Sequence, residues 1–328
     1  MTGGFKSRIS GLGYSIPERV VTNFDLEKIV ETSDEWIQTR TGIKKRHIAE
    51  KGTRSSDLGT AAARQALQHA GISPQDLDLI IVATITPDMY FPSTACRIQN
   101  NLGASCGAFD LAAACSGFPY ALTAAEGFIA TGHYRNVLVV GAEVLSGFID
   151  WKDRSTCVLF GDGAGAAVVT RAEGSSRILA SLLGSDGSQG EILKIPGGGS
   201  AFPPSKETLE QGLHFLKMEG SEVFKVAVRT MEVAVRDVLE KGGVKLEEVD
   251  WLIPHQANIR ILQAVAERLK IPSDKVVINV ERFGNMSSAS TVVALAEAVQ
   301  DGRVKPGQNV VLVAFGGGLT WAANLIKW

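Results

Sequence analysis

Three side chains of this sequence have the types and settings of one shared active site. Cys115 lies in the run Ala-Ala-Ala-Cys-Ser-Gly (residues 112–117), where a short strand is expected to turn sharply into a helix. His255 directly follows an apolar run, and Asn285 follows a glycine and precedes small residues. A thiol can act as a nucleophile, whereas an imidazole and a carboxamide can donate hydrogen bonds to a developing negative charge. These settings predict a site built from all three.

Cys115 is the candidate nucleophile. The unpaired amides at a helix start favour negative charge, so they are expected to lower the pKa of this thiol and raise its thiolate fraction. A free cysteine is more often a buried filler. The small residues around Cys115 would let backbone or substrate approach and favour the nucleophile, whereas Cys96, Cys106 and Cys157 have no such setting.

The sequence contains an internal repeat that links Cys115 to Asn285. Seventeen residues separate Cys115 from Gly132, and seventeen separate Asn285 from Gly302. A step of seven residues from glycine to aspartate also recurs before an apolar strand, at 71–78 and 243–250. Asn285 would therefore occupy the place in one half that Cys115 holds in the other. A favoured helix N-cap is the simpler interpretation of Asn285 alone, but the repeat favours a shared site.

Other features are consistent with such a site. His255 follows Pro254 at the expected carboxyl end of a buried strand, where folds of this kind collect ligands, although a core histidine is the simpler interpretation of the residue alone. The glycines 316–318 follow the last long apolar run and could point backbone amides into a cavity as an oxyanion hole. A plain turn is the alternative.

The elements that must position these residues form an α/β pattern. Helical periodicity covers residues 56–70 and 224–241, and the runs between helices are continuous Ile, Val and Leu rather than alternating. Such alternation predicts right-handed parallel units covered by helices. Two copies give a duplicated fold of five layers (α-β-α-β-α), with halves at 1–172 and 173–328.

Composition bounds the function. The chain has 328 residues, 45% of them hydrophobic and 21% charged, with a net charge of −2, which gives no support for binding nucleic acid. No apolar run is long enough for a signal peptide or a membrane helix. The cysteines and histidines lack metal-binding spacing. We expect a cytoplasmic chain with free thiols, no metal, no nucleic acid and no membrane partner.

The motifs, taken in order, resemble those of the thiolase superfamily and of its β-ketoacyl-(acyl-carrier-protein) synthase III family, over essentially the whole chain. They are Thr-Ser-Asp-Glu-Trp-Ile (32–37), Arg-Thr-Gly-Ile (40–43) and the runs 112–117, 161–166, 254–260, 284–290 and 314–321. The resemblance implies a thiolase-like duplicated fold. It also implies an acyltransferase that joins an acyl-CoA primer, by default acetyl-CoA, to malonyl-acyl-carrier protein. The products are 3-oxoacyl-carrier protein, CoA and CO2, formed through an acyl-cysteine at the start of fatty acid synthesis.

The resemblance also implies partners and residue roles. No permanently bound cofactor is implied; coenzyme A thioester is a substrate, malonyl-carrier protein a partner, and the family forms homodimers with a pocket shared across the dimer. Cys115 resembles the nucleophile, His255 and Asn285 the pair that binds the malonyl thioester, and the amides of Cys115 and Gly317 the oxyanion hole. The implied coenzyme A contacts are Thr32, Trp36, Arg40, Arg154, Phe224 and Asn258, with Trp36 and Arg154 on either face of the adenine. The implied carrier-protein contacts are Gln256, Ala257, Asn258, Ile259, Arg260 and Lys225. The implied acyl pocket is Phe91, Leu145 and Phe160.

Three alternatives compete with this reading. The 140 residues from Cys115 to His255, with an asparagine 30 further on, fit the spacing of a papain-like cysteine hydrolase, but its local signature is missing and the repeat has no place in that fold. An inactive scaffold would keep the fold without the chemistry. A specialised synthase that starts polyketides or quinolones is the nearest rival, and the length of the primer stays open.

Overall fold

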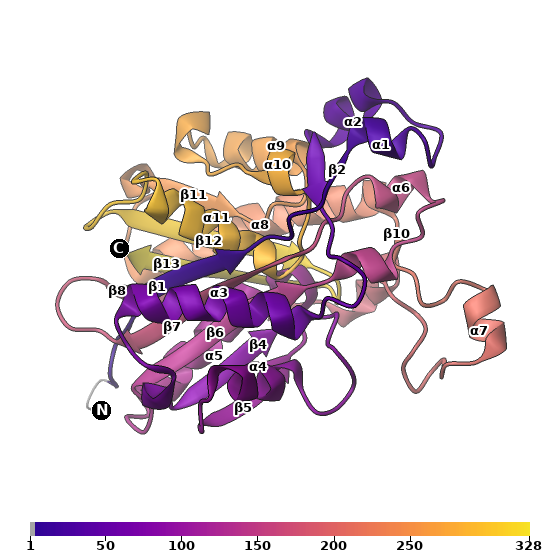
Figure 1. The fold of residues 1–328 in the computed structure, drawn as a ribbon. Coiled ribbons are helices and arrows are strands. Elements are labelled where there is room, and N and C mark those ends of the chain that lie inside the picture. The colour runs from indigo at the N-terminus through magenta and orange to yellow at the C-terminus, as the bar shows by residue number, and fades with distance from the viewer. Residues whose placement is uncertain (1–3) are drawn as a thin grey trace.

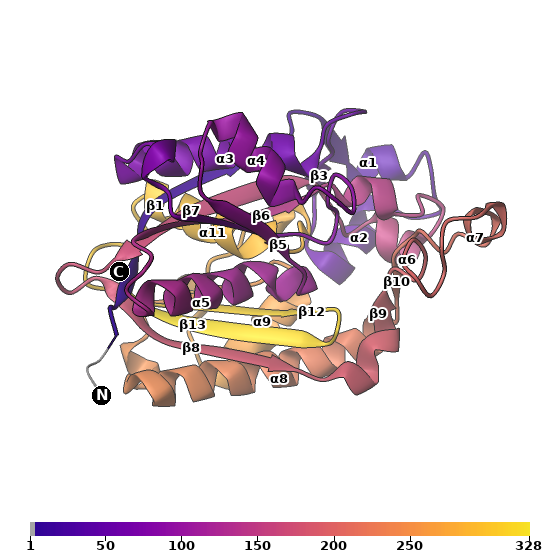
Figure 2. The same cartoon turned by 90° about the horizontal axis from the view of Figure 1, so that it is seen from below.

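The structure is a computed structural model that describes residues 4–328, and its frame is two sheets with helices between and outside them (Figures 1 and 2). The first sheet has five strands in the order β1-β7-β6-β4-β5. They are β1 (Ser7–Ser15), β4 (Leu79–Ala83), β5 (Gly107–Leu111), β6 (Asn136–Glu143) and β7 (Gly163–Arg171). The second has four strands in the order β11-β12-β13-β8. They are β8 (Arg177–Ser185), β11 (Trp251–Pro254), β12 (Asn309–Gly316) and β13 (Thr320–Lys327).

Helices form three layers around these sheets, as Figure 2 shows from below. Residues of α5 (Gly117–Ala130) and α11 (Ala289–Gln300) share one hydrophobic cluster with strands of both sheets, so these two helices form the middle layer. The outer face of the first sheet packs against α3 (Ser55–Ala70) and α4 (Thr94–Leu102). The outer face of the second packs against α8 (Gly220–Gly242) and α9 (Ile259–Leu269). The predicted five-layer α/β fold is confirmed.

The middle layer explains why α5 and α11 have few polar residues. A helix enclosed by two sheets is apolar on all sides. Phe118 and Leu122 of α5 and Val292 and Leu295 of α11 are 0% exposed. The strands beside them, such as β4 and most of β6, are buried on both faces, which accounts for their continuous apolar runs.

The sheets are mixed, so the predicted parallel units form only part of each sheet. In the first sheet β4 runs parallel to β5 and β6, but β7 runs antiparallel to β6 and β1. In the second, β11 and β12 are parallel, whereas β13 runs antiparallel to β12 and β8. The reason at β12–β13 is the connection of three residues, 317–319, because a link that short can join only antiparallel neighbours. The division at 172 falls between β7 and β8, which belong to different sheets, and stays a prediction as a domain boundary.

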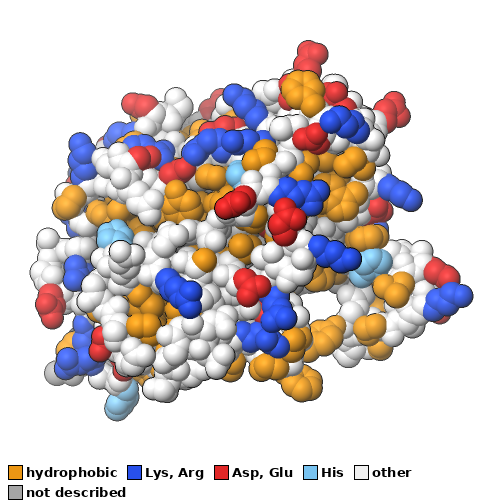
Figure 3. Space-filling model, in the orientation of Figure 1, with side chains coloured by type: hydrophobic (Ala, Val, Ile, Leu, Met, Phe, Trp, Pro, Cys, Tyr) orange, Lys and Arg blue, Asp and Glu red, His pale blue; other side chains and the backbone are white. Residues whose placement is uncertain are grey.

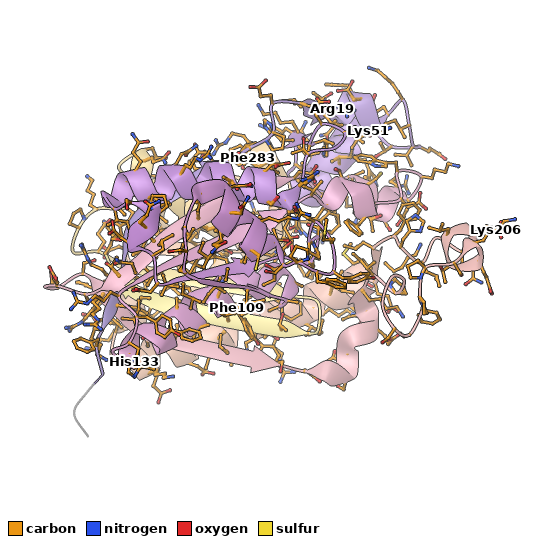
Figure 4. All side chains as sticks on the ribbon, turned by 60° about the horizontal axis from the view of Figure 1, so that its bottom comes forward. Arg19, Lys51, Phe109, His133, Lys206 and Phe283 are labelled. Atoms are coloured by element: carbon orange, nitrogen blue, oxygen red, sulfur yellow. The ribbon has the colours of Figure 1, made fainter. Side chains whose placement is uncertain are left out.

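Short elements gather at one end of the sheets. They are β2 (Val20–Thr22), α1 (Asn23–Leu26), α2 (Asp34–Thr41), β3 (Lys45–His47), α6 (Arg154–Cys157), β9 (Leu193–Lys194), α7 (Lys206–Glu210), β10 (Lys217–Met218) and α10 (Val280–Phe283). The segment that carries α7 stands out from the body of the molecule, with an opening between the two (Figure 3). Lys206 lies on this projection (Figure 4). No helix among residues 4–328 is both long and apolar enough to cross a membrane.

The contact between β1 and α3 gives a test of the packing. A Cβ on Gly13 would lie 2.4 Å from the carbonyl oxygen of Ala62 and 2.6 Å from the backbone nitrogen of Ala66, and backbone cannot swing aside. We expect Gly13→Ala to lower the free energy of unfolding by about 1–3 kcal/mol, measured as a lower denaturant midpoint. Gly127→Ala is the matched control, since nothing lies within 4 Å of that position on α5. It should raise stability by up to about 1 kcal/mol, and equal effects of the two changes would contradict the packing.

Candidate active site

Cys115 lies in a single 3-10 turn, Ala114–Ser116, between β5 and α5. Ala114 has φ 46°, a left-handed conformation that few residues other than glycine adopt and that re-aims the chain sharply. The thiol is buried, at 7% exposure. The helix α5 begins at Gly117, two residues later than the sequence pattern predicted. A Cβ on Gly117 would lie 2.9 Å from that of Ala83, so the small residue lets the turn pack against β4.

The second half of the chain packs directly on this turn. A Cβ on Gly316, the last residue of β12, would lie 2.6 Å from the backbone nitrogen of Cys115. The Thr320 hydroxyl donates to the carbonyl of Ala113 at 2.9 Å, and the Ser116 hydroxyl donates to the carbonyl of Thr320 at 3.0 Å. The glycine after β12, Gly317, is thereby held beside the cysteine turn.

His255 follows β11 in the second half and is 2% exposed. Its backbone N–H donates to the carbonyl of Val313 at 2.7 Å, which continues the parallel pairing of β11 with β12. Neither ring nitrogen has a hydrogen-bond partner within residues 4–328. Burial lowers the pKa of His255 to about 3. The imidazole is therefore neutral at pH 7, with one nitrogen able to donate a hydrogen bond to a substrate.

Asn285 is fixed by its own backbone and by the next turn. Its N–H donates to the carbonyl of Leu159 at 2.9 Å, and its carbonyl accepts from the N–H of Gly161 at 3.0 Å. Its side-chain oxygen accepts from the N–H of Ser287 at 2.8 Å. Because that oxygen is occupied, the amide NH2 is the group left to donate.

The repeat holds at the ends of the two helices but not at their starts. The helix α11 begins at Ala289, four residues after Asn285, whereas α5 begins two residues after Cys115. The expectation that Asn285 occupies the place of Cys115 is therefore wrong by two residues. The extra residues form the turn through Ser287, which itself has φ 46°.

The three predicted side chains meet at one cavity of about 880 Å³. Cys115 comes from the first half, and His255 and Asn285 come from the second. Gly317 also lines this cavity. The arrangement places a nucleophile, two hydrogen-bond donors and candidate oxyanion amides around one enclosed space.

The expectation of a lowered thiol pKa is wrong. Burial raises the pKa of Cys115 to about 12, a negative charge on the nearby Glu143 would add to the rise, and the neighbouring Ser287 side chain opposes it. In a buried site, the loss of solvation destabilises a thiolate more than the helix start stabilises it. The resting group is a thiol.

The predicted coenzyme A residues lie at or beside the mouth of this cavity. Trp36, Arg40 and Asn258 line it. The guanidinium carbon of Arg154 lies 4.7 Å from the centre of the Trp36 ring, and Arg154 also donates to the carbonyl of Glu31 at 3.0 Å. A planar base between the two side chains must displace the Arg154 guanidinium from the indole.

Two other predicted coenzyme A residues lie outside the cavity wall in the described part of the chain. Thr32 has a buried hydroxyl without a hydrogen-bond partner among residues 4–328. Phe224, near the start of α8, lies under the guanidinium of Arg260, with 5.5 Å between guanidinium carbon and ring centre. Phe224 directly follows Val223, which does line the cavity.

The acyl-pocket residues divide. Leu145 and Phe160 line the cavity and are buried. Phe91 is 84% exposed and does not line it. Phe91 does not contribute to the cavity of its own chain, because its loop between β4 and α4 points outward, and its place in an acyl pocket stays a prediction.

Gln256 corrects the predicted carrier-protein surface. It is 0% exposed, and its amide nitrogen donates to the carbonyls of Pro254 at 2.8 Å and Val277 at 3.0 Å. Its oxygen accepts from the N–H groups of Asn279 at 2.9 Å and Val280 at 3.2 Å. With its hydrogen-bonding capacity used internally, Gln256 braces the turn after His255 and cannot dock a partner.

The rest of that segment has a different character. Asn258 caps α9, since its side-chain oxygen accepts from the N–H of Ile261 at 3.0 Å. Ala257 and Ile259 are half-buried, and Arg260 is exposed. Lys225 is exposed and forms an ion pair with Glu222 at 2.8 Å.

Sequence reasoning missed much of the cavity wall. Residues of β9, β10 and the first turns of α8 line it, namely Leu193, Lys194, Met218, Ser221, Ala227 and Met231. The strands β9 and β10 are two residues each, too short for any periodic signal. Among residues 4–328, no group of three His, Cys, Asp or Glu side chains is placed to hold a metal ion.

Comparison with known families agrees with this geometry. The model of the 3-oxoacyl-(acyl-carrier-protein) synthase III family matches residues 109–187, and the model of the C-terminal part of that family matches residues 239–328. A β-ketoacyl-(acyl-carrier-protein) synthase III of Caldanaerobacter subterraneus is 57% identical over 321 residues, which is 98% of this chain and 97% of the relative.

Solved structures give the same result. The synthase III crystal structure from Aquifex aeolicus has a TM-score of 0.92 at 53% identity, covering 98% of this chain and 100% of that one. A priming β-ketosynthase of the R1128 polyketide pathway has a TM-score of 0.91 at 37% identity, covering 99% and 97%. The family assignment removes the cysteine-hydrolase alternative. The chain belongs to the β-ketoacyl-(acyl-carrier-protein) synthase III family of acyltransferases.

Proposed function

We propose that Cys115, His255 and Asn285 carry out the reaction of this family, which condenses an acyl-CoA with malonyl-acyl-carrier protein and starts fatty acid synthesis. The observation that supports these assignments is the single cavity lined by all three side chains. A nucleophile from one half and two donors from the other suit a reaction of two steps, with one covalent intermediate between them.

In the first step the Cys115 sulfur attacks the thioester carbon of acyl-CoA. The backbone amides of Cys115 and Gly317 stabilise the tetrahedral oxyanion. When the intermediate collapses, the carbon–sulfur bond to coenzyme A breaks, the acyl group stays on Cys115, and the thiol proton leaves with coenzyme A. The raised pKa of Cys115 means that this proton departs only when a bound thioester can accept the charge.

In the second step malonyl-carrier protein enters the same cavity. Loss of CO2 leaves an enolate, whose oxygen accepts hydrogen bonds from the neutral imidazole of His255 and the amide NH2 of Asn285. Each preorganised donor of this kind contributes about 2.7–4 kcal/mol. The enolate carbon then attacks the acyl carbon, and the Cys115 thiolate leaves and regains a proton.

A second copy of the chain completes the proposed pocket. The strand β5 is at the open edge of the first sheet, with Phe109 on it (Figure 4), and an unpaired edge is a surface that another chain can extend. Phe91, on the loop between β4 and α4, is exposed near this edge. We place it in the acyl pocket of the partner in a homodimer.

Surface features support a carrier-protein partner and a cytoplasmic location. Arg260 and Lys225 are exposed on neighbouring helices α9 and α8 beside the mouth of the cavity, which suits an acidic carrier. All four cysteines are free, which agrees with a reducing cytoplasm. Acetyl-CoA is the proposed primer.

Replacing the nucleophile should stop turnover. We expect Cys115→Ala to lower the rate of 3-oxoacyl-carrier formation from acetyl-CoA at least about a thousandfold, since removing a covalent nucleophile costs this much or more. Cys96→Ala is the control, because Cys96 is exposed and outside the cavity. Retention of most activity by Cys115→Ala would revive the alternative of a scaffold without this chemistry.

Removing a donor should separate the two steps. In His255→Ala and in Asn285→Ala, decarboxylation of malonyl-carrier protein should fall about 100- to 1,000-fold, while acylation by acyl-CoA in a rapid-mixing assay falls far less. His133→Ala is the control, since His133 is exposed at the end of the molecule opposite the projecting α7 (Figure 4). Equal loss of both steps in the donor variants would contradict the assigned roles.

Removing the Arg154 side chain from its stack on Trp36 should weaken binding of acyl-CoA. Arg154→Ala is expected to raise the KM for acetyl-CoA about tenfold, with a much smaller change in kcat, because a contact to a remote part of the substrate is lost. Steady-state kinetics measure both values. Lys152→Ala removes an exposed cation two residues away and is the matched control. The KM for acetyl-CoA should be unchanged in this variant.

A further inference from the structure

Glu143 is a buried carboxyl group close to the active site, and the assigned chemistry does not use it. It ends β6 and is 0% exposed. Hydroxyl groups and a backbone amide surround it, and it forms no ion pair within residues 4–328. An ionised carboxylate in such a place is costly unless a cation compensates it.

Its two oxygens differ in their shortest contacts. One of them, Oε2, accepts from the Thr86 hydroxyl at 2.7 Å, from the N–H of Ile85 at 3.2 Å and from the Thr84 hydroxyl at 3.3 Å. The other, Oε1, lies 3.4 Å from the Ile85 nitrogen and 2.8 Å from the Ser288 hydroxyl oxygen. That same hydroxyl oxygen lies 2.9 Å from the backbone carbonyl of Ala83.

The two short contacts of the Ser288 hydroxyl indicate that Glu143 supplies a proton to one of them. A serine hydroxyl has one proton, and a backbone carbonyl can only accept. If Glu143 were ionised, one proton of Ser288 would serve two acceptors. With a proton on Oε1, Glu143 donates to Ser288, and Ser288 donates to Ala83, so each short contact has its own proton. Burial raises the pKa of the Glu143 carboxyl, in the direction that favours this state.

Ser288 is the link from this acid to Asn285. It lies three residues after Asn285, whereas Ala83 and Glu143 end strands β4 and β6 of the first half. The space around it is tightly filled. A Cβ on Gly141 would lie 2.7 Å from the Ser288 carbonyl oxygen, and one on Gly117 would lie 3.2 Å from the Ser288 Cβ. Through Ser288, the turn that carries Asn285 is held against the sheet that carries the cysteine turn.

We propose that Glu143 is a positioning residue that stays protonated and, by donating to Ser288, fixes Asn285 relative to Cys115. The inference rests on the proposed role of Asn285. It predicts that loss of the Glu143 donor impairs decarboxylation of malonyl-carrier protein more than acylation of Cys115. A neutral Glu143 also places no second negative charge near the sulfur, whose ionisation a charged Glu143 would oppose.

The test compares two replacements of nearly the same size. In E143Q the amide is neutral and its NH2 can donate to Ser288, whereas E143L has no donor. We expect decarboxylation in E143L to fall about 100-fold and acylation less than about tenfold, as for loss of one preorganised donor. The loss in E143Q should be at least about tenfold smaller than in E143L. Equal losses in the two variants, or equal loss of both steps in E143L, would overturn the proposal.

Infrared spectroscopy tests the protonation state without the reaction. The difference spectrum of wild type minus E143Q at neutral pH should contain the C=O stretch of a protonated carboxyl group. Carboxylate bands in its place would overturn the proposal. Because this readout needs no turnover, it separates failure of this inference from failure of the assigned roles of Cys115 and Asn285. Should E143L not fold, S288A takes its place, with the same unequal loss of the two steps expected.

Discussion

The active site depends on one contact, the approach of the end of β12 to the cysteine turn. Gly316 touches the backbone of Cys115 so closely that any side chain there would collide with it. This contact fixes the two halves of the chain against each other where their reactive groups must meet. The hydrogen bonds of Thr320 to Ala113 and of Ser116 to Thr320 stabilise the same contact between the cysteine turn and the second half. Without it, a nucleophile from one half and donors from the other would share no cavity.

Burial at this junction sets the protonation states that the chemistry uses. It raises the pKa of Cys115 and lowers that of His255, so the resting pair is a thiol and a neutral imidazole. A neutral resting pair avoids the cost of a buried net charge. In the proposed mechanism, charge develops in the transition states, and the backbone amides and the Asn285 NH2 are the groups assigned to stabilise it. On this proposal, the fold stabilises the intermediates of both steps more than either resting state.

Much of this arrangement could be predicted from the sequence, and the failures have physical causes. Continuous apolar runs identified buried strands, and the repeat predicted that Cys115 and Asn285 lie at one site. Gln256 looked like part of a docking segment, because a linear motif does not show that its amide is used by four backbone groups. Phe91 is exposed in its own chain, because a sequence motif does not show which way a loop is directed or which copy's pocket its side chain serves. The prediction of a lowered pKa for the Cys115 thiol was wrong because a helix start is a local feature, whereas desolvation depends on the whole fold.

The central claim is that Cys115 carries the acyl group between the two steps, and mass spectrometry of the intact and digested protein tests it most directly. After incubation with acetyl-CoA alone, we expect one acetyl group per chain, located on the peptide that contains Cys115. Addition of malonyl-carrier protein should remove that group and yield 3-oxoacyl-carrier protein with loss of CO2. An unmodified Cys115 peptide, or an acetyl group that survives the second substrate, would contradict the account.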